Sequence, residues 1–174
     1  GLRQVATGGM LLSALSFLGL SMTDFSTQQW QAWGLMTLLG FSAASALLAS
    51  TSAIMAAAPK EKASAAGAIE TMAYELGAGL GIALFGLILT RSYSSAIELP
   101  AGIGGEAAVQ ASSSIGEAMK VAQSLPAIPA DSLIAAAKTA FISAHSISLA
   151  TAGVLLLLLA LGIWRGLTNT PAPR

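Results

Sequence analysis

Residues 63–91 read ASAAGAIETMAYELGAGLGIALFGLILTR, and this stretch decides the fold class. It is apolar except for the carboxylates of Glu70 and Glu75, and its next charged residue is Arg91. A hydrocarbon core of about 30 Å is crossed by roughly 20 helical residues. The stretch therefore predicts a membrane-spanning helix from about Ala63 to Thr90.

Three further apolar stretches are long enough to span the same core. They cover about Val5–Met22, Ala32–Ala57 and Thr139–Trp164, and the last contains five consecutive leucines, residues 155–159. The whole chain of 174 residues is 55% hydrophobic and only 9% charged, whereas soluble domains are about 25% charged. The predicted fold class is all-α: a polytopic membrane protein with four transmembrane helices.

The connections divide the chain into three parts. Residues 1–93 hold the first three spanning helices, residues 94–138 form a long external connection, and residues 139–174 hold the last helix and a cytoplasmic tail. Long loops without structure of their own are uncommon, and Gly105–Leu125 places small residues on one helical face. A second helix after Pro129, with Asp131 as its N-cap, would run into the last span. The connection is therefore expected to be a helical hairpin.

The basic residues predict the orientation. Five basic residues are predicted to lie on the same side of the membrane: Arg3, Lys60, Lys62, Arg165 and Arg174. The short turn after the first helix carries Asp24 and no basic residue, so the positive-inside bias places both termini in the cytoplasm. Trp30, Trp33 and Trp164 fall at predicted helix ends, where indole rings suit the headgroup level.

Small residues predict where helices pack. In the second helix they form a stripe at helical spacing, made of Ser42, Ser45, Ala46, Ala49, Ser52 and Ala53. Gly67, Gly77 and Gly81 lie on one stripe of the third helix. In lipid such stripes let helix backbones approach closely.

The two carboxylates of the third helix are the candidate functional groups. A charge at the bilayer centre costs about 2.5 to 3.5 kcal/mol. Glu75 lies about 18 Å along the helix from Ala63, near the midplane, and Glu70 about 10 Å. Their five-residue separation turns them about 140° apart, so they face different surroundings.

Each carboxylate has two interpretations. Glu75 suits a group that exchanges a proton or meets a cation, because its charge is costly without a partner. Glu70 shares a stripe with Tyr74 and has two equally supported interpretations. It could take the same role as Glu75, or it could make a structural hydrogen bond to a neighbouring helix near the cytoplasmic boundary.

Several function classes are excluded or not predicted. Eight basic residues balance eight acidic ones, so no net charge draws the chain to nucleic acid. With no cysteine and one histidine, His145, neither a metal site nor another bound cofactor is expected. No hydrolase or metalloprotease motif occurs, and we do not predict an enzyme.

Residues 58–70, 74–77 and 81–86 resemble the penultimate helix of fourteen-helix drug/proton antiporters of the major facilitator superfamily. The methyl viologen and quaternary ammonium exporters of that family are the nearest in pattern. The resemblance extends over the whole chain as helices eleven to fourteen, part of the family's C-terminal bundle, and is most specific between Glu70 and Gly86.

The resemblance implies multidrug efflux across the inner (plasma) membrane: lipophilic organic cations leave the cell in exchange for protons. Acidic residues of the penultimate helix face the drug cavity in that family, which places substrate binding and proton coupling at Glu75 and Glu70, with Tyr74 beside them. Some relatives carry a further carboxylate where this chain has Thr71. The implied partners are the organic cation, protons, the lipid bilayer and the N-terminal helices of the same transporter.

Two other classes remain open. One is a self-contained four-helix structural or assembly subunit without transport activity, in which the carboxylates only organise helix contacts. The other is a small exporter that works as a homodimer. A chain that is a piece of a longer transporter is not expected to transport alone.

Topology can be tested with single cysteines, because the chain has none of its own. In intact cells, Ser113→Cys should react with a membrane-impermeant thiol reagent added outside. Glu61→Cys should react only after the membrane is permeabilised. Reversed labelling would contradict the orientation.

Overall fold

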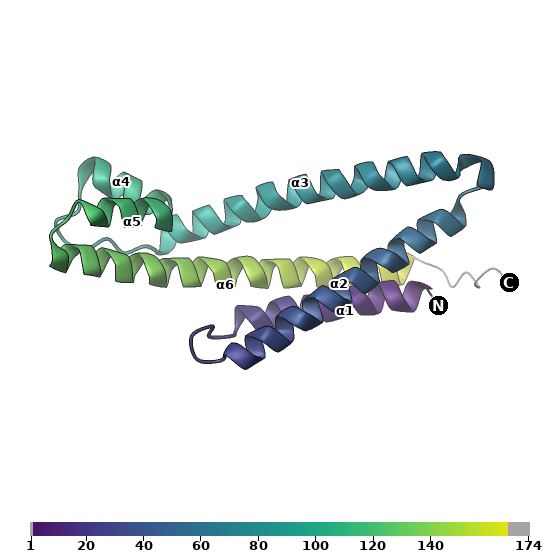
Figure 1. Cartoon of the computed structure of the whole chain (residues 1–174), viewed down its shortest axis with the longest axis horizontal. Helices are drawn as coiled ribbons and strands as arrows, with labels where there is room; N and C mark the ends of the chain where they lie inside the picture. The colour runs from purple at the N-terminus through teal and green to yellow at the C-terminus, as the bar shows by residue number, and fades with distance from the viewer. Residues whose placement is uncertain (1, 167–174) are drawn as a thin grey trace. The chain divides into compact units, whose positions relative to one another are not determined.

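The computed structural model describes residues 2–166, and all regular elements among them are helices (Figure 1). In chain order these are α1 (Leu2–Ser21), α2 (Gln29–Ala57), the short 3-10 helix η1 (Lys60–Lys62), α3 (Ala63–Ala96), α4 (Gly105–Ser113), α5 (Ile115–Gln123) and α6 (Ala127–Gly166). By length and composition α1, α2, α3 and α6 can each cross a membrane. The predicted all-α class with four spanning helices is confirmed. The tail with Arg174 lies outside the described residues.

The largest difference from the predicted boundaries is at the last helix. The helix expected after Pro129 does run without a break into the span predicted from Thr139. It begins at Ala127, so Asp131 lies inside α6 and is not its N-cap. Pro129 stands in the first turn of α6. Proline is tolerated there because the first N–H groups of a helix have no acceptor within the helix. The proline therefore does not delay the start of α6.

Residues 94–138 contain α4, α5 and the first turns of α6. The single helix expected over Gly105–Leu125 is divided at Ser114, which has an extended backbone with φ −165° and ψ 160°. The Ser114 hydroxyl accepts a hydrogen bond from the backbone N–H of Glu117 at 3.2 Å. Serine in this conformation is a favourable N-cap, so Ser114 both ends α4 and starts α5.

The turn between α1 and α2 is organised by Asp24. Its Oδ1 accepts hydrogen bonds from the backbone N–H of Ser26 at 2.9 Å and from the Ser26 hydroxyl at 2.6 Å, and its Oδ2 accepts one from Thr27 at 2.9 Å. These bonds hold the pKa of the exposed Asp24 below its ordinary value, and the bond from the Ser26 hydroxyl has the largest effect. The acidic residue that marks this connection in the sequence thus has a local structural role.

The chain forms two compact units, residues 1–81 with 149–174 and residues 82–148. In the first unit α1 and α2 lie side by side. A Cβ on Gly9 would stand 2.9 Å from the carbonyl oxygen of Ser42 and 3.0 Å from the Cβ of Ala46. The hydroxyls of Ser13 and Ser42 share a hydrogen bond of 2.8 Å. Ser42, Ala46 and Ala49 are buried, which confirms half of the small-residue stripe predicted for α2.

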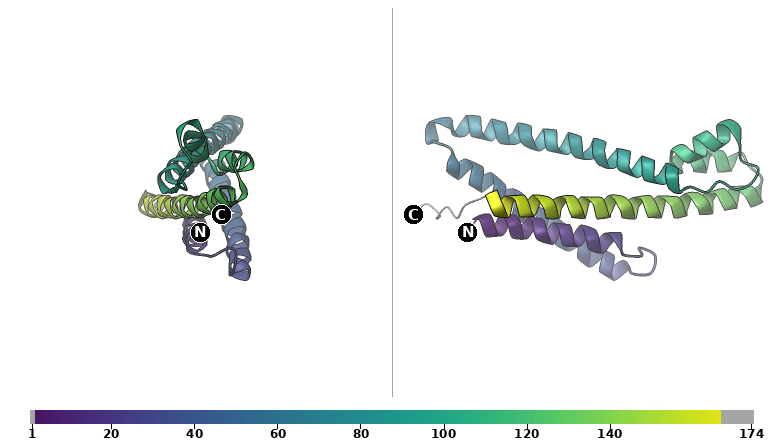
Figure 2. Two further views of the ribbon diagram at one scale, coloured as in Figure 1. Left: turned by 90° about the vertical axis from the view of Figure 1, so that its left-hand side faces the viewer. Right: turned by 180° about the vertical axis from the view of Figure 1, so that it is seen from behind.

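The opposite side of α1 meets the C-terminal part of α6, and Figure 2 shows the two helices together. A Cβ on Gly153 would stand 2.7 Å from Cγ of Leu18 and 3.1 Å from the carbonyl oxygen of Ala14. Ala14 is completely buried. Glycine is therefore needed on both sides of α1 to allow the observed approach.

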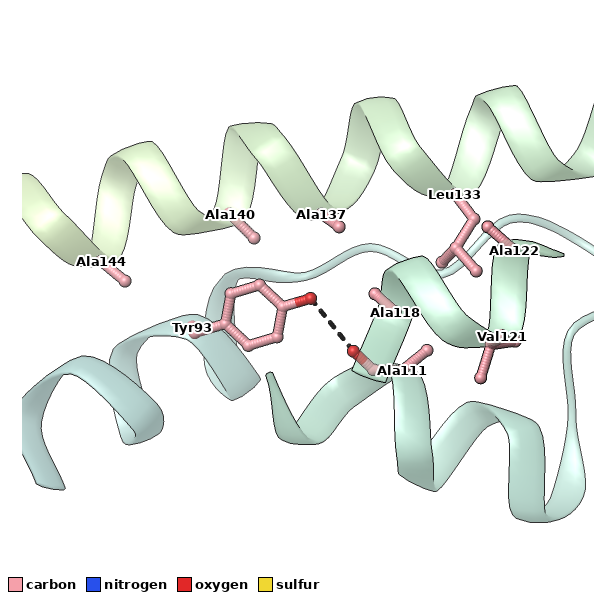
Figure 3. Close-up of a cluster of buried hydrophobic side chains, with 9 residues drawn as sticks. All are labelled: Tyr93, Ala111, Ala118, Val121, Ala122, Leu133, Ala137, Ala140 and Ala144. Atoms are coloured by element: carbon pink, nitrogen blue, oxygen red, sulfur yellow. Dashed lines mark hydrogen bonds between the residues drawn. The ribbon is translucent and has the colours of Figure 1, made fainter. Parts of the chain in front are cut away.

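The second unit has a core made mainly of alanines (Figure 3). Its buried members come from four helices and are Tyr93, Ala111, Ala118, Val121, Ala122, Leu133, Ala137, Ala140 and Ala144. The Tyr93 hydroxyl donates to the backbone oxygen of Ala111 at 3.1 Å, which ties the end of α3 to α4. Alanine faces on α5 and α6 let these helices pack closely around the ring of Tyr93.

Gly9→Ala should destabilise the first unit by about 1 to 3 kcal/mol, because the new methyl group meets backbone atoms that cannot move aside cheaply. Gly8→Ala is the matched control, since a Cβ there has nothing within 4 Å. Alanine also favours helix by about 1 kcal/mol over glycine, so Gly8→Ala should be neutral or stabilising. Unfolding in mixed micelles measures both. Equal effects of the two changes would contradict the packing.

Candidate functional site

Glu70 is tied to α2. Thr51 donates a hydrogen bond from its hydroxyl to Oε1 of Glu70, and Glu70 is partly buried. Thr51 lies about two turns before the end of α2, and Glu70 about two turns after the start of α3. The reversal at Pro59 and η1 therefore brings the two side chains to the same level. A hydrogen bond to a neighbouring helix is the structural interpretation that the sequence left open for this residue.

Glu75 is placed differently. It is exposed, and it makes no hydrogen bond or ion pair with the residues that the structure describes. It lies twelve residues after Ala63, the first residue of α3, which is about 18 Å along the helix. The two carboxylates look alike in the sequence but differ in the structure. Glu70 is hydrogen-bonded, and Glu75 has no partner among the described residues.

The surroundings of Glu75 on α3 are also uncovered. Tyr74 is 58% exposed, Leu76 67% and Met72 62%. Met72 shares the helix face of Glu75, whereas Tyr74 lies about 100° away around the helix, on the stripe of Glu70. The exposed carboxylate attracts positive charge, and so does the face of the aromatic ring on the neighbouring stripe.

The glycines predicted to pack against another helix have no neighbour within the described chain. A Cβ on Gly67, Gly77 or Gly81 would meet nothing within 4 Å. Their role in helix packing stays a prediction.

The close contacts that do exist involve glycines to which the sequence analysis gave no role, Gly9, Gly19 and Gly153. Small residues in α1 form a stripe of the same type as in α2, at Gly9, Ser13 and Ser16. This helical spacing is the signal that could have identified α1 as a packing helix.

His145 stacks on Phe141, with ring centroids 6.0 Å apart and an interplanar angle of 15°. Both residues lie in the second compact unit, on α6. No group of three or more potential metal ligands occurs among residues 2–166. The carboxylates on α3 are groups that can exchange a proton or pair with a cation.

Four apolar helices, one of which carries carboxylates within its span, define a polytopic membrane protein, and comparison with known proteins gives its relatives. The chain is 70% identical over 169 residues to the methyl viologen resistance protein SmvA of two Salmonella typhimurium strains, 14028s and LT2. This match covers 97% of the chain and 34% of each relative. It is also 41% identical over 108 residues to the multidrug efflux pump LfrA of Mycolicibacterium smegmatis, covering 62% of the chain and 21% of that relative.

The resemblance predicted from the sequence is confirmed. The chain is similar to proteins of the major facilitator superfamily, over 97% of its length to SmvA and over 62% to LfrA. The chain spans about a third of the length of the two SmvA relatives. No family model matches it, and no solved structure does.

The bond between Thr51 and Glu70 can be measured with a double-mutant cycle. Thr51→Val and Glu70→Leu should be non-additive in unfolding free energy, with a coupling of about 0.6 to 1.7 kcal/mol, as for hydrogen bonds between helices in lipid. Thr37→Val is the control, because Thr37 lies on the same helix but bonds to its own backbone at Trp33. Its effect should add to that of Glu70→Leu. A coupling near zero for Thr51 would contradict the contact.

Proposed function

We propose that this chain forms part of a proton-coupled exporter of lipophilic organic cations, in which Glu75 binds the cation and the proton in alternation. Support comes from the names of the relatives, a methyl viologen resistance protein and a multidrug efflux pump. Methyl viologen is a dication with an apolar body, so a protein that exports it needs negative charge inside an apolar environment.

The observation that carries the proposal is the exposed carboxylate of Glu75, which has no partner among residues 2–166 and lies about 18 Å along α3 from Ala63. An ionised carboxylate costs about 2.5 to 3.5 kcal/mol at the centre of a bilayer. Either a bound proton or a bound organic cation removes this cost. Because one site cannot hold both, cation binding releases the proton and proton binding releases the cation.

Glu70 has a secondary role in this proposal. Its oxygen already accepts a hydrogen bond from Thr51, so part of its capacity for a ligand is used. It also lies nearer the start of α3, where solvation lowers the cost of either protonation state. Glu70 then positions α3 against α2, while Tyr74 offers its exposed ring to the cation beside Glu75.

The remaining parts of the proposal concern the setting. The transporter lies in the inner membrane, both ends of this chain face the cytoplasm, and the other helices of the full-length protein complete the drug cavity. The exposed face of α3 around Glu75 is the surface that those helices would cover. Alternating access between two helical bundles moves the site from one side to the other.

Glu75→Gln in the full-length protein should abolish most export of methyl viologen and remove the pH dependence of cation binding, since the amide keeps the shape but not the charge. In the parent protein, binding should weaken as pH falls, because protons compete for Glu75. Glu75→Asp should keep part of both activities, and Glu70→Gln should be milder than Glu75→Gln. Equilibrium binding at several pH values and transport in vesicles measure these effects.

Glu61→Gln is the matched control, because Glu61 is an exposed carboxylate in η1 outside the spanning part of α3. It should leave both measurements unchanged. Cation binding by Glu75→Gln with the parent's pH dependence would assign the coupling to another carboxylate. If no form of the full-length protein binds or transports cations, the structural-subunit alternative is favoured.

A further inference from the structure

A groove of about 580 Å³ lies between α1 and the end of α6, within the first compact unit. Its α1 wall consists of Gln4, Thr7, Gly8 and Leu11, which follow the i, i+3, i+4, i+7 spacing of one helix face. The volume lies within the range of about 300 to 1,000 Å³ that small-molecule sites have. The groove is therefore large enough for a ligand.

The α6 wall has the same spacing and includes Leu157, Leu161 and Trp164. The start of α1 and the end of α6 lie together (Figure 2), so Gln4 and Trp164 mark one end of the groove. Leu11 is seven residues further along α1, about 10 Å deeper. One end is thus polar and aromatic, and the remainder is aliphatic.

Thr7 is the unusual residue of this groove. It is only 4% exposed, and its hydroxyl oxygen has no hydrogen-bond partner among the described residues. Other buried hydroxyls of the same unit are satisfied, since Ser16 donates to the backbone of Leu12 and Thr23 to that of Gly19. An unsatisfied buried hydroxyl is destabilising, so a ligand that supplies an acceptor here is favoured.

Two arginines are next in sequence to the residues at the polar end of the groove, and neither is among its lining residues. Arg165 follows Trp164 directly, in the last turn of α6, and is exposed. Arg3 lies in the first turn of α1. No acidic residue occurs in the first turn of α1, and basic residues next to a membrane surface attract anionic lipid headgroups.

We propose that the groove binds an anionic phospholipid. One acyl chain lies against Leu11, Leu157 and Leu161, and the phosphate is near Arg165. Rotation about χ1 of Thr7 turns its buried hydroxyl toward the groove, where an ester carbonyl oxygen accepts its hydrogen bond. Trp164 lies at the level of the ester groups, where indole rings are favoured in membranes. The site does not include Glu75 and does not depend on the proposed transport activity.

The test uses the full-length protein in phosphatidylcholine vesicles. These contain increasing small fractions of phosphatidylglycerol or phosphatidylcholine with brominated acyl chains, because bromine quenches indole fluorescence on contact. The signal of Trp164 is the difference between the parent and Trp164→Phe. Brominated phosphatidylglycerol should quench this signal at a lower fraction than brominated phosphatidylcholine.

Variants separate the parts of the site. Gly8→Leu should fill the groove and remove the extra quenching, since a Cβ on Gly8 meets nothing within 4 Å and the fold can accept it. Gly162→Leu is the control, because Gly162 is also open but is not part of the groove wall. Arg165→Gln should weaken the preference for phosphatidylglycerol about fivefold. Thr7→Val should weaken binding of both lipids about threefold.

Equal quenching by both lipids, unchanged in Gly8→Leu, would show contact with bulk lipid only and would overturn the proposal. Absence of quenching by either lipid would show that protein covers the groove and would overturn it equally. A preference for phosphatidylglycerol that survives Arg165→Gln undiminished would contradict the assigned headgroup position.

Discussion

The close approach of α1 to its neighbours at Gly9 and Gly153 is the contact on which the first compact unit depends. Lipid tails are as apolar as leucine side chains, so burial alone does not hold membrane helices together. Association then rests on van der Waals contact between backbones and on hydrogen bonds such as that between Ser13 and Ser42. Glycine permits this on one face of α1 against α2 and on another against α6. The groove between α1 and α6 exists because the same two helices are held together at Gly153.

The second unit uses the same principle with alanine in place of glycine. Its buried face on α6 is formed by Leu133, Ala137, Ala140 and Ala144 at helical spacing. Small side chains bring α4 and α5 near enough for one tyrosine, Tyr93, to fill the centre and bond to the backbone of α4. The connection formed by residues 94–138 is consequently a packed structure and not a loose linker. Any movement of this connection would have to separate these contacts or carry them along.

The two carboxylates of α3 differ in their surroundings. Glu70 is bonded to Thr51, which satisfies one oxygen and links two helices near the turn at η1. Glu75 has no partner among the residues that the structure describes, and an ionised carboxylate in an apolar helix is costly unless a proton or cation is bound.

The sequence by itself determined the number of spanning helices, the all-α class and the location of the candidate site on α3, because hydrocarbon thickness and the cost of intramembrane charge act on composition alone. It also indicated the packing face of α2. The sequence did not determine that α6 starts at Ala127. Pro129 and Asp131 are residues typical of a helix start, and they do not show by themselves that the first turn begins before them. Only the tertiary structure distinguished Glu70 from Glu75, left Thr7 buried without a partner and assigned close packing to Gly9 and Gly153 while leaving Gly77 and Gly81 open. These outcomes depend on which helix lies opposite each residue, and helical spacing specifies a face but not its neighbour.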